Sequence, residues 1–174
     1  MRPLLVRDLM SEEVFTLGPQ DDLTFLYDLT DAEHIRHVPV VGEEGELEGL
    51  VTHRDLLRSA LSGTAGLPLS LQRESLRRRT VREIMITAVE TIEPDRPVGD
   101  AAQIMLDNQY GCLPVLEGRK LVGILTEADF VKCLVGMIPG VHVTLHAEHH
   151  EPTDRNRGGP AARPAPRDSR RKTG

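Results

Sequence analysis

The chain consists of two copies of one sequence pattern, and this repeat constrains its fold more than any other feature. The segment Val6–Met10 (VRDLM) returns 75 residues later as Val81–Met85 (VREIM). Two longer stretches repeat in the same order: VPV at 38–40 with LPV at 113–115, and GLVTHRD at 49–55 with GILTEAD at 123–129. Because order and chemistry agree and the spacing differs by only one residue, in the turn before the last stretch, the chain is a tandem duplication.

Each copy predicts the element order β-α-β-β-α. Short apolar segments at 14–17 and 89–92 lead into turns, and a helix with apolar residues at helical spacing follows each turn. Asp21 or Asp22 in the first copy and Asp95 in the second are the predicted helix N-caps. The strands of the two hairpins are expected at 37–41 and 47–51 in copy one and at 112–116 and 121–125 in copy two. Since a hairpin with one helix cannot bury its apolar face alone, the two copies should pack sheet to sheet.

The predicted organisation has five segments: repeat 1 at 4–62, a linker at 63–78, repeat 2 at 79–137, a short His-rich extension at 138–150 and a basic tail at 151–174. The tail is rich in Pro, Gly and Arg and offers little to bury, so we expect it to be disordered. From residue 147 onward seven basic residues oppose four acidic ones, whereas 14 basic residues oppose 23 acidic ones before it. An acidic body argues against a nucleic-acid-binding protein.

No apolar run is long enough to cross a membrane, and the two cysteines are too few for a disulfide framework. A cytoplasmic protein with reduced thiols is therefore expected. Walker, Rossmann, nucleophile-elbow and HExxH motifs are missing from the sequence, so we do not expect an enzyme.

The repeated motifs resemble those of a Bateman module, a tandem pair of CBS (cystathionine β-synthase) domains, over about residues 4–137. The resemblance implies an α/β (α+β) fold with a pseudo-two-fold axis and a cleft on each side of it. It also implies adenine nucleotides (AMP, ADP or ATP) or S-adenosylmethionine as regulatory ligands in these clefts, with no required cofactor. Two such modules commonly join into a disc-shaped dimer, so we expect a homodimer that regulates an unknown partner.

The Thr-x-x-Asp motif is the predicted ligand contact in each copy. Thr52 and Thr126 lie at strand-to-helix junctions, where free backbone N–H groups favour a phosphate. Asp55 and Asp129 lie in the first helical turn, where a carboxylate can accept hydrogen bonds from ribose hydroxyls. The alternative is a capping box, in which the Thr caps the helix and the acid reaches back. The sequence leaves both readings open.

The two copies differ around this motif. The first copy supplies four candidate phosphate contacts: Arg36, His37, His53 and Arg54. The second has Gly111, Cys112, Glu127 and Ala128 at these positions, which offer less to a polyanion. The candidate apolar walls for a flat base are Val14, Ile86 and Val89, although each could instead belong to the core. Arg36, His53 and Arg54 could equally be solvated surface.

The sequence has two other clusters of charged or metal-ligating residues, and each has a simpler explanation. The extension carries candidate metal ligands at His142, His146, His149 and His150, but a solvated chain end explains them more simply. The arginines at 73, 77, 78, 79 and 82 could bind an anionic partner, but an exposed linker helix is the preferred interpretation. The predicted function is therefore a non-enzymatic sensor of an adenosine-containing ligand. The alternatives are a ligand-free structural or adaptor dimer and a metal-responsive module that uses the segment His142–His150.

Overall fold

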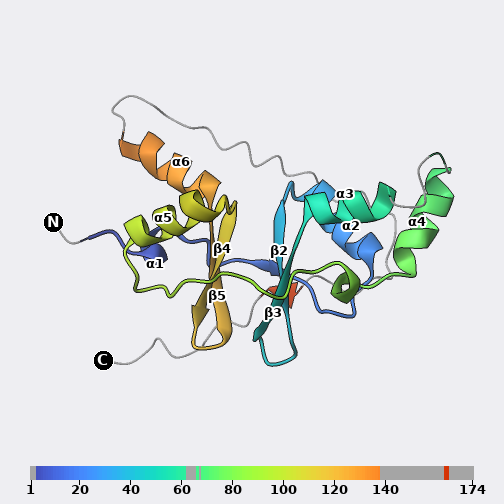
Figure 1. The fold of residues 1–174 in the computed structure, drawn as a ribbon, viewed down its shortest axis with the longest axis horizontal. Helices are drawn as coiled ribbons and strands as arrows, with labels where there is room; N and C mark the ends of the chain where they lie inside the picture. Colours follow the sequence, from blue (N-terminus) through green and yellow to red (C-terminus); the bar gives the residue numbers. More distant parts are fainter. Residues whose placement is uncertain (1–2, 62–65, 67, 138–162, 165–174) are drawn as a thin grey trace. The chain divides into compact units, whose positions relative to one another are not determined.

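The structure, a computed structural model, describes residues 3–61, 66, 68–137 and 163–164. Its helices are α1 (Val6–Leu9), α2 (Leu23–Ala32), α3 (His53–Leu61), α4 (Leu69–Arg77), α5 (Val98–Asn108), α6 (Glu127–Met137) and the short 3-10 helix η1 (Val81–Glu83) (Figure 1). Its strands are β1 (Phe15–Thr16), β2 (His37–Val41), β3 (Leu47–Thr52), β4 (Cys112–Glu117), β5 (Lys120–Thr126) and β6 (Arg163–Pro164). The mixture of helices and small two-stranded sheets confirms the predicted class.

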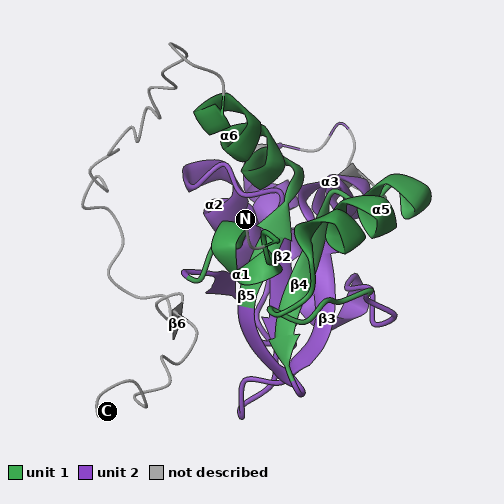
Figure 2. Cartoon of the chain, turned by 90° about the vertical axis from the view of Figure 1, so that its left-hand side faces the viewer, with its two compact units in different colours: residues 1–12, 90–117, 123–161 green, residues 13–89, 118–122, 162–174 purple. Residues whose placement is uncertain are grey.

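The chain divides into two compact units that do not coincide with its two sequence repeats (Figure 2). Unit 1 comprises residues 1–12, 90–117 and 123–161, and unit 2 comprises residues 13–89, 118–122 and 162–174. Each unit therefore combines most of one repeat with the first segment of the other. We call Val6–Met10 and Val81–Met85 the lead segments.

The lead segments are bound in the same way in the two units. In unit 1, Val6 N–H donates to the Arg96 carbonyl (2.9 Å). In unit 2, Val81 N–H donates to the Asp21 carbonyl (2.8 Å), which is the equivalent position one repeat away. Val6 and Val81 are both fully buried. Each lead segment is thus anchored to the turn that precedes the first long helix of the opposite copy.

Both predicted hairpins are present. β2 pairs antiparallel with β3, with Val38 opposite Val51, and β4 pairs with β5. β1 lies parallel to the other edge of β2, where Leu17 N–H donates to the Pro39 carbonyl and Leu17 O accepts from Val41 N–H. Copy two repeats this arrangement with a parallel bridge between Ile92 and Val115.

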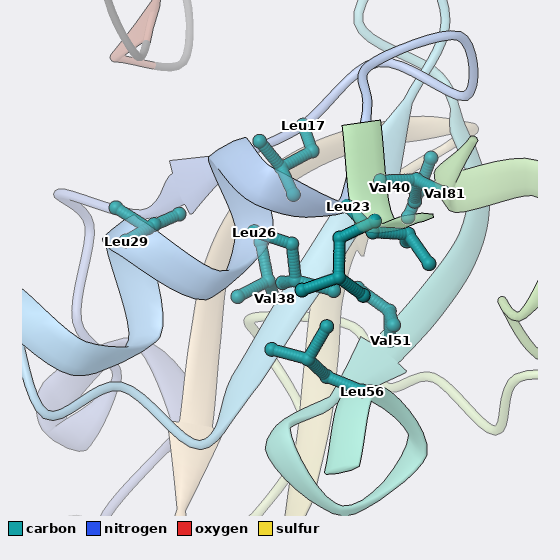
Figure 3. Packing of buried hydrophobic residues seen from close by; sticks show 10 residues of the cluster. Leu17, Leu23, Leu26, Leu29, Val38, Val40, Val51, Leu56 and Val81 are labelled. Carbon is teal, nitrogen blue, oxygen red and sulfur yellow. The ribbon is translucent and has the colours of Figure 1, made fainter. Parts of the chain in front are cut away.

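The core of unit 2 is aliphatic, as the low aromatic content requires (Figure 3). Leu23, Leu26 and Leu29 form the buried face of α2. They cluster with Leu17, Val38, Val40, Val51, Leu56, Leu76 and Val81. Full burial of each such side chain contributes about 1.5–3 kcal/mol relative to exposure. This packing fixes the hairpin and α3, and so fixes the junction between them.

One of the predicted helix caps is correct and one is wrong. Asp22 caps α2, because its carboxylate accepts from the N–H groups of Thr24 (2.9 Å) and Phe25 (3.1 Å). Asp95 does not cap α5, which begins after Pro97 without a side-chain cap. Proline has no N–H and its φ suits a helix start, so the start moves two residues along the chain. Asp95 forms an ion pair with Arg7 instead.

The arginine-rich linker contains a helix, α4, as the sequence predicts. Its arginines and those that follow are mostly paired within unit 2 rather than held free. Four ion pairs account for them: Arg73 with Asp28, Arg78 with Glu74, Arg79 with Glu83, and Arg82 with Glu48. Because these charges are largely neutralised, the cluster gives little support to an anionic partner.

The predicted His-rich extension and basic tail lie outside the described residues, except for β6. Arg163 and Pro164 pair antiparallel with Thr16 and Phe15, so at these two residues the structure has a strand where the sequence predicts none. None of the helices in the described part of the chain is both long and apolar enough to cross a membrane.

Candidate functional site

The Thr-x-x-Asp motif of unit 2 lies where β3 ends and α3 begins. Thr52 N–H and Thr52 Oγ1 both donate to Asp55 Oδ2, at 3.1 and 2.5 Å. Asp55 N–H donates back to Thr52 Oγ1 at 3.2 Å. This is a capping box with Asp in place of the usual Glu, so the capping alternative is confirmed for Thr52 and Asp55. Contact with a ligand stays a prediction.

The motif of unit 1, at the junction of β5 and α6, has the same two bonds from the Thr to the Asp carboxylate. Thr126 N–H and Thr126 Oγ1 donate to Asp129 Oδ2 at 2.8 and 2.7 Å. In both units the pair therefore uses one carboxylate oxygen to hold the start of the helix. The second oxygen, Oδ1, remains for other donors.

The surroundings of Oδ1 differ between the two aspartates. The Asp55 side chain is 17% exposed, and its Oδ1 lies 3.8 Å from Nη1 of Arg58, beyond hydrogen-bond distance. The Asp129 side chain is only 6% exposed, and its Oδ1 lies 3.3 Å from the Lys132 ammonium. Asp55 therefore has more capacity to accept a hydrogen bond from an incoming hydroxyl than Asp129 has.

The four basic candidates of copy one gather at the same end of the β2–β3 hairpin. His37 is the register partner of Thr52, and His53 N–H donates to the Arg36 carbonyl at 3.0 Å. Arg54 follows His53 on α3. Arg36, His53 and Arg54 are exposed and His37 is half-buried. The backbone thus brings these predicted residues together around the Thr52–Asp55 pair.

The equivalent end of the β4–β5 hairpin has the same backbone closure with different side chains. Glu127 N–H donates to the Gly111 carbonyl at 3.2 Å, matching His53 and Arg36. Cys112 takes the place of His37, and burial raises the pKa of its thiol to about 12. A neutral, buried thiol is not a nucleophile, which agrees with its interpretation as a small filler.

The three residues predicted to contact a flat base differ in their exposure to solvent and in their position in unit 2. Val14 is 5% exposed and precedes β1. Because Leu17 is level with Val40 in the parallel pairing, Val14 is level with His37. Ile86 is 49% exposed and forms a backbone bridge with Leu50, two residues before Thr52. Val89 is half-buried and follows Ile86 by three residues in the sequence.

The bridge at Ile86 has an equivalent in unit 1. There Ser11 exchanges two backbone hydrogen bonds with Ile124 (2.9 and 3.0 Å), as Ile86 does with Leu50 (2.8 and 2.9 Å). The residue that follows the lead segment of one copy therefore lies beside the strand that leads into the motif of the other copy. Unit 2 has an exposed isoleucine at this position, and unit 1 has a serine.

The motif glycines permit this close approach, a role that the sequence interpretation missed. A Cβ on Gly49 would lie 2.8 Å from the Ile86 carbonyl oxygen and 2.9 Å from Met85 Sδ. A Cβ on Gly123 would lie 2.7 Å from Met10 Sδ and 3.1 Å from the Ser11 carbonyl oxygen. The signal was available, since Gly and Met both recur at matching places in the two copies.

Two basic residues next to the aspartates were also missed. Arg58 and Lys132 each lie three residues after the Asp of their motif, one helical turn along α3 or α6. They occupy equivalent positions in the two copies, so the repeat itself pointed to them.

The metal-ligand candidates in the extension fall outside the described residues. Within the part of the chain that the structure describes, no three His, Cys, Asp or Glu side chains are arranged to hold a metal ion.

Comparison with known proteins identifies the repeats. The model of the CBS domain matches residues 6–62 and 81–136. A CBS domain-containing protein of Dictyostelium discoideum is 33% identical over 139 residues, which cover 79% of this chain and 96% of that protein.

Two solved structures have the same fold. The first was assigned as the acetoin utilization protein AcuB of Vibrio cholerae and is 32% identical, with a TM-score of 0.67 over 78% of this chain and 93% of that one. The second is the CBS domain pair of protein MJ0100 in complex with 5′-methylthioadenosine and S-adenosyl-L-methionine. It is 27% identical, with a TM-score of 0.66 over 79% of this chain and all of that one.

Proposed function

Because the chain belongs to the CBS domain family and contains two such domains in tandem, we propose that it is a non-catalytic regulatory module that senses an adenosine-containing ligand. The ligand binds at the Thr-x-x-Asp motifs, and its occupancy is passed to a partner protein. The module needs no cofactor for this function.

The observation that carries the proposal is how the two carboxylate oxygens of Asp55 are bonded. Its Oδ2 holds the start of α3, while its side chain is 17% exposed and its Oδ1 lies outside hydrogen-bond distance of Arg58. A carboxylate in this state can accept a hydrogen bond from a ribose hydroxyl without losing its capping bonds. The N-terminal turn of α3 adds backbone N–H groups and a partial positive charge next to it.

The two units favour different ligands. Arg36, His53 and Arg54 are exposed beside the unit 2 motif and can form charge-assisted bonds with phosphate oxygens. Unit 2 is therefore the site for AMP, ADP or ATP. At the four equivalent positions unit 1 has Gly111, Cys112, Glu127 and Ala128, none of which is basic, and this suits an adenosyl ligand without phosphates, such as S-adenosylmethionine. The adenosyl ligands of the MJ0100 domain pair support this class.

Exposed apolar side chains on two helices of unit 1 support a homodimer of about twice 19.3 kDa. The side chains are Leu106 on α5 (75% exposed) and Val131, Leu134 and Met137 on α6 (59%, 61% and 65%). Apolar patches of this kind mark interaction sites in soluble proteins. Since α6 begins at Thr126–Asp129, ligand at the motif and the partner subunit would contact the same helix. We place the module in the cytoplasm, where its two free thiols would stay reduced.

Isothermal titration of the full chain with AMP, ADP, ATP and S-adenosylmethionine tests the proposal. We expect saturable binding of at least one ligand, with the phosphorylated ligands lost in Asp55→Ala. An Asp31→Ala variant controls for removal of an exposed carboxylate elsewhere in the same unit. If none of the four ligands produces a binding signal, the chain is a ligand-free adaptor instead.

A further inference from the structure

Strand β1 has a neighbouring strand on each edge. On one edge Leu17 exchanges backbone hydrogen bonds with β2. On the other edge β6, from the C-terminal part of the chain, pairs antiparallel with β1, with Arg163 opposite Thr16 and Pro164 opposite Phe15. All three strands belong to unit 2, so the C-terminal segment is part of the same compact body as the site.

The alternation of the backbone explains this register. Successive residues of a strand direct their N–H and C=O groups to opposite edges. Because those of Leu17 point to β2, those of Thr16 point to the edge that β6 occupies. In an antiparallel ladder hydrogen-bonded pairs alternate with pairs that are not hydrogen-bonded. Thr16 and Arg163 therefore form the hydrogen-bonded pair.

Proline at position 164 fits this register. Opposite Phe15 it occupies the pair that exchanges no hydrogen bonds, where the missing N–H of proline costs nothing. A shift by one residue would place the proline opposite Thr16 and remove a donor. Thr16 is only 6% exposed, and buried backbone groups must be paired, so the correct register matters here.

We propose that this edge of β1 is a strand-addition site and that its occupant is the chain's own segment Arg163–Pro164. The docked segment closes the edge and prevents other extended chains from pairing with it, which is how native sheets avoid edge-to-edge association. Val14, a candidate contact for the base of the ligand, directly precedes this strand.

Charge and tether length favour this occupant. Residues 147–174 carry seven basic and four acidic residues, and Glu13, Asp21 and Asp22 flank β1 closely in the sequence. Twenty-five residues separate Met137 from Arg163, which gives a long tether. Because the segment is covalently linked to the strand with which it pairs, its local concentration is on the order of millimolar, far above that of a free competitor.

Hydrogen exchange of the Thr16 amide in the full chain tests the proposal. Arg163→Pro removes the N–H that pairs with the Thr16 carbonyl, and we expect exchange of the Thr16 amide to become faster by about tenfold. Arg167→Pro is the matched control and should leave this exchange rate unchanged. Arg163→Gln should also leave it unchanged, because the pairing uses the backbone. Equal Thr16 exchange in Arg163→Pro and the natural chain would overturn the proposal.

Dilution distinguishes the chain's own segment from that of a second copy. Protection of Thr16 that does not depend on protein concentration supports the intramolecular strand. Protection that falls on dilution would show that the strand comes from another molecule and would overturn the proposal as stated.

Deletion of residues 151–174 should open the same edge at little cost in stability. Among the described residues the deletion removes the two strand pairs of Arg163 and Pro164, so we expect the Tm to fall by no more than about 2–4 °C. A larger fall in a thermal melt followed by circular dichroism would mean that the segment docks over far more than β1.

Discussion

The two Thr-x-x-Asp sites share a backbone and differ in almost every side chain around it. Both have the Thr hydroxyl bonded to the Asp carboxylate, the closure between hairpin and helix, and a bridge from the residue that follows the lead segment of the opposite copy. Basic residues surround the motif in unit 2, whereas a glycine, a buried thiol and a glutamate surround it in unit 1. After duplication, the hydrogen bonds that define the fold were retained, while the positions that would contact a ligand diverged.

Replacing each aspartate in turn should reveal the largest difference between the two sites, measured as the affinity for ATP. Asp55→Ala loses a charge-assisted hydrogen bond worth about 1.5–3 kcal/mol, so the Kd for ATP should rise by about 10- to 150-fold. Asp129→Ala should leave the Kd for ATP unchanged, because its carboxylate belongs to the other site. Calorimetry of both variants measures this, and equal losses of ATP binding would contradict the assignment of ATP to unit 2.

Adding a methyl group to each motif glycine should destabilise the two units unequally. Gly49→Ala places Cβ against a backbone oxygen at 2.8 Å, whereas Gly123→Ala mainly meets the flexible Met10 side chain. We expect Gly49→Ala to lower the free energy of unfolding by about 1–3 kcal/mol and Gly123→Ala by less.

Urea denaturation provides the values for this pair. The double variant Gly123→Ala, Met10→Ala should recover part of the loss if the sulfur is the obstacle. If Gly123→Ala costs more than Gly49→Ala, the backbone contact is not the limiting one.

Replacing one basic residue should test whether the unit 2 site prefers a charged, phosphate-containing ligand. Arg36→Gly gives unit 2 the residue that unit 1 has, and loss of one exposed phosphate contact should weaken ATP binding by about threefold to tenfold. Binding of adenosine, which has no phosphate, should not change. Titrations at low and high salt check the result, since the natural chain should lose more ATP affinity with salt than Arg36→Gly does.

The buried Cys112 thiol should link the stability of the fold to pH. Burial raises the pKa of Cys112 to about 12, whereas an unfolded thiol loses its proton near 8.5. Deprotonation therefore favours the unfolded chain, and the thiol's contribution is complete below about pH 8.5 and is lost as pH rises towards about 12.

Chemical denaturation across this alkaline range checks the expectation. Cys112→Ala should flatten the decline of the unfolding free energy with pH. Cys133→Ala, at a half-buried position of α6, leaves Cys112 in place, so the decline of the unfolding free energy with pH should persist in this variant. The same slope in both variants would contradict the burial of Cys112 as its cause.

Much of the fold was predictable because its signals are local and occur twice. The hairpins, the helices that begin after Thr52 and Thr126, and the Asp22 cap all follow from residues within a few positions of one another. The start of α5 was missed because Pro97 outweighed Asp95 as a boundary signal. The exchange of lead segments was missed because alignment of the copies shows which residues correspond, and not which copy each one contacts.

The site was predictable in its residue types and less so in its geometry. The sequence brought Arg36, His37 and His53 to one end of a hairpin, since strand pairing determines their neighbours. The sequence could not show that Oδ1 of Asp129 accepts a hydrogen bond from Lys132, whereas Oδ1 of Asp55 lies 3.8 Å from Arg58, beyond hydrogen-bond distance. That difference depends on side-chain rotamers and burial, which a pattern of residue types does not specify.

The reciprocal placement of Val6–Met10 and Val81–Met85 has a consequence for the history of such a chain. A single ancestral copy could not have completed its own compact body, because its first segment belongs on another copy. Two separate molecules would have had to trade these segments, as in domain swapping, at a rate and yield set by their concentration. Fusion of the genes made the trade intramolecular, so that the completed structure no longer depended on how much protein a cell contained.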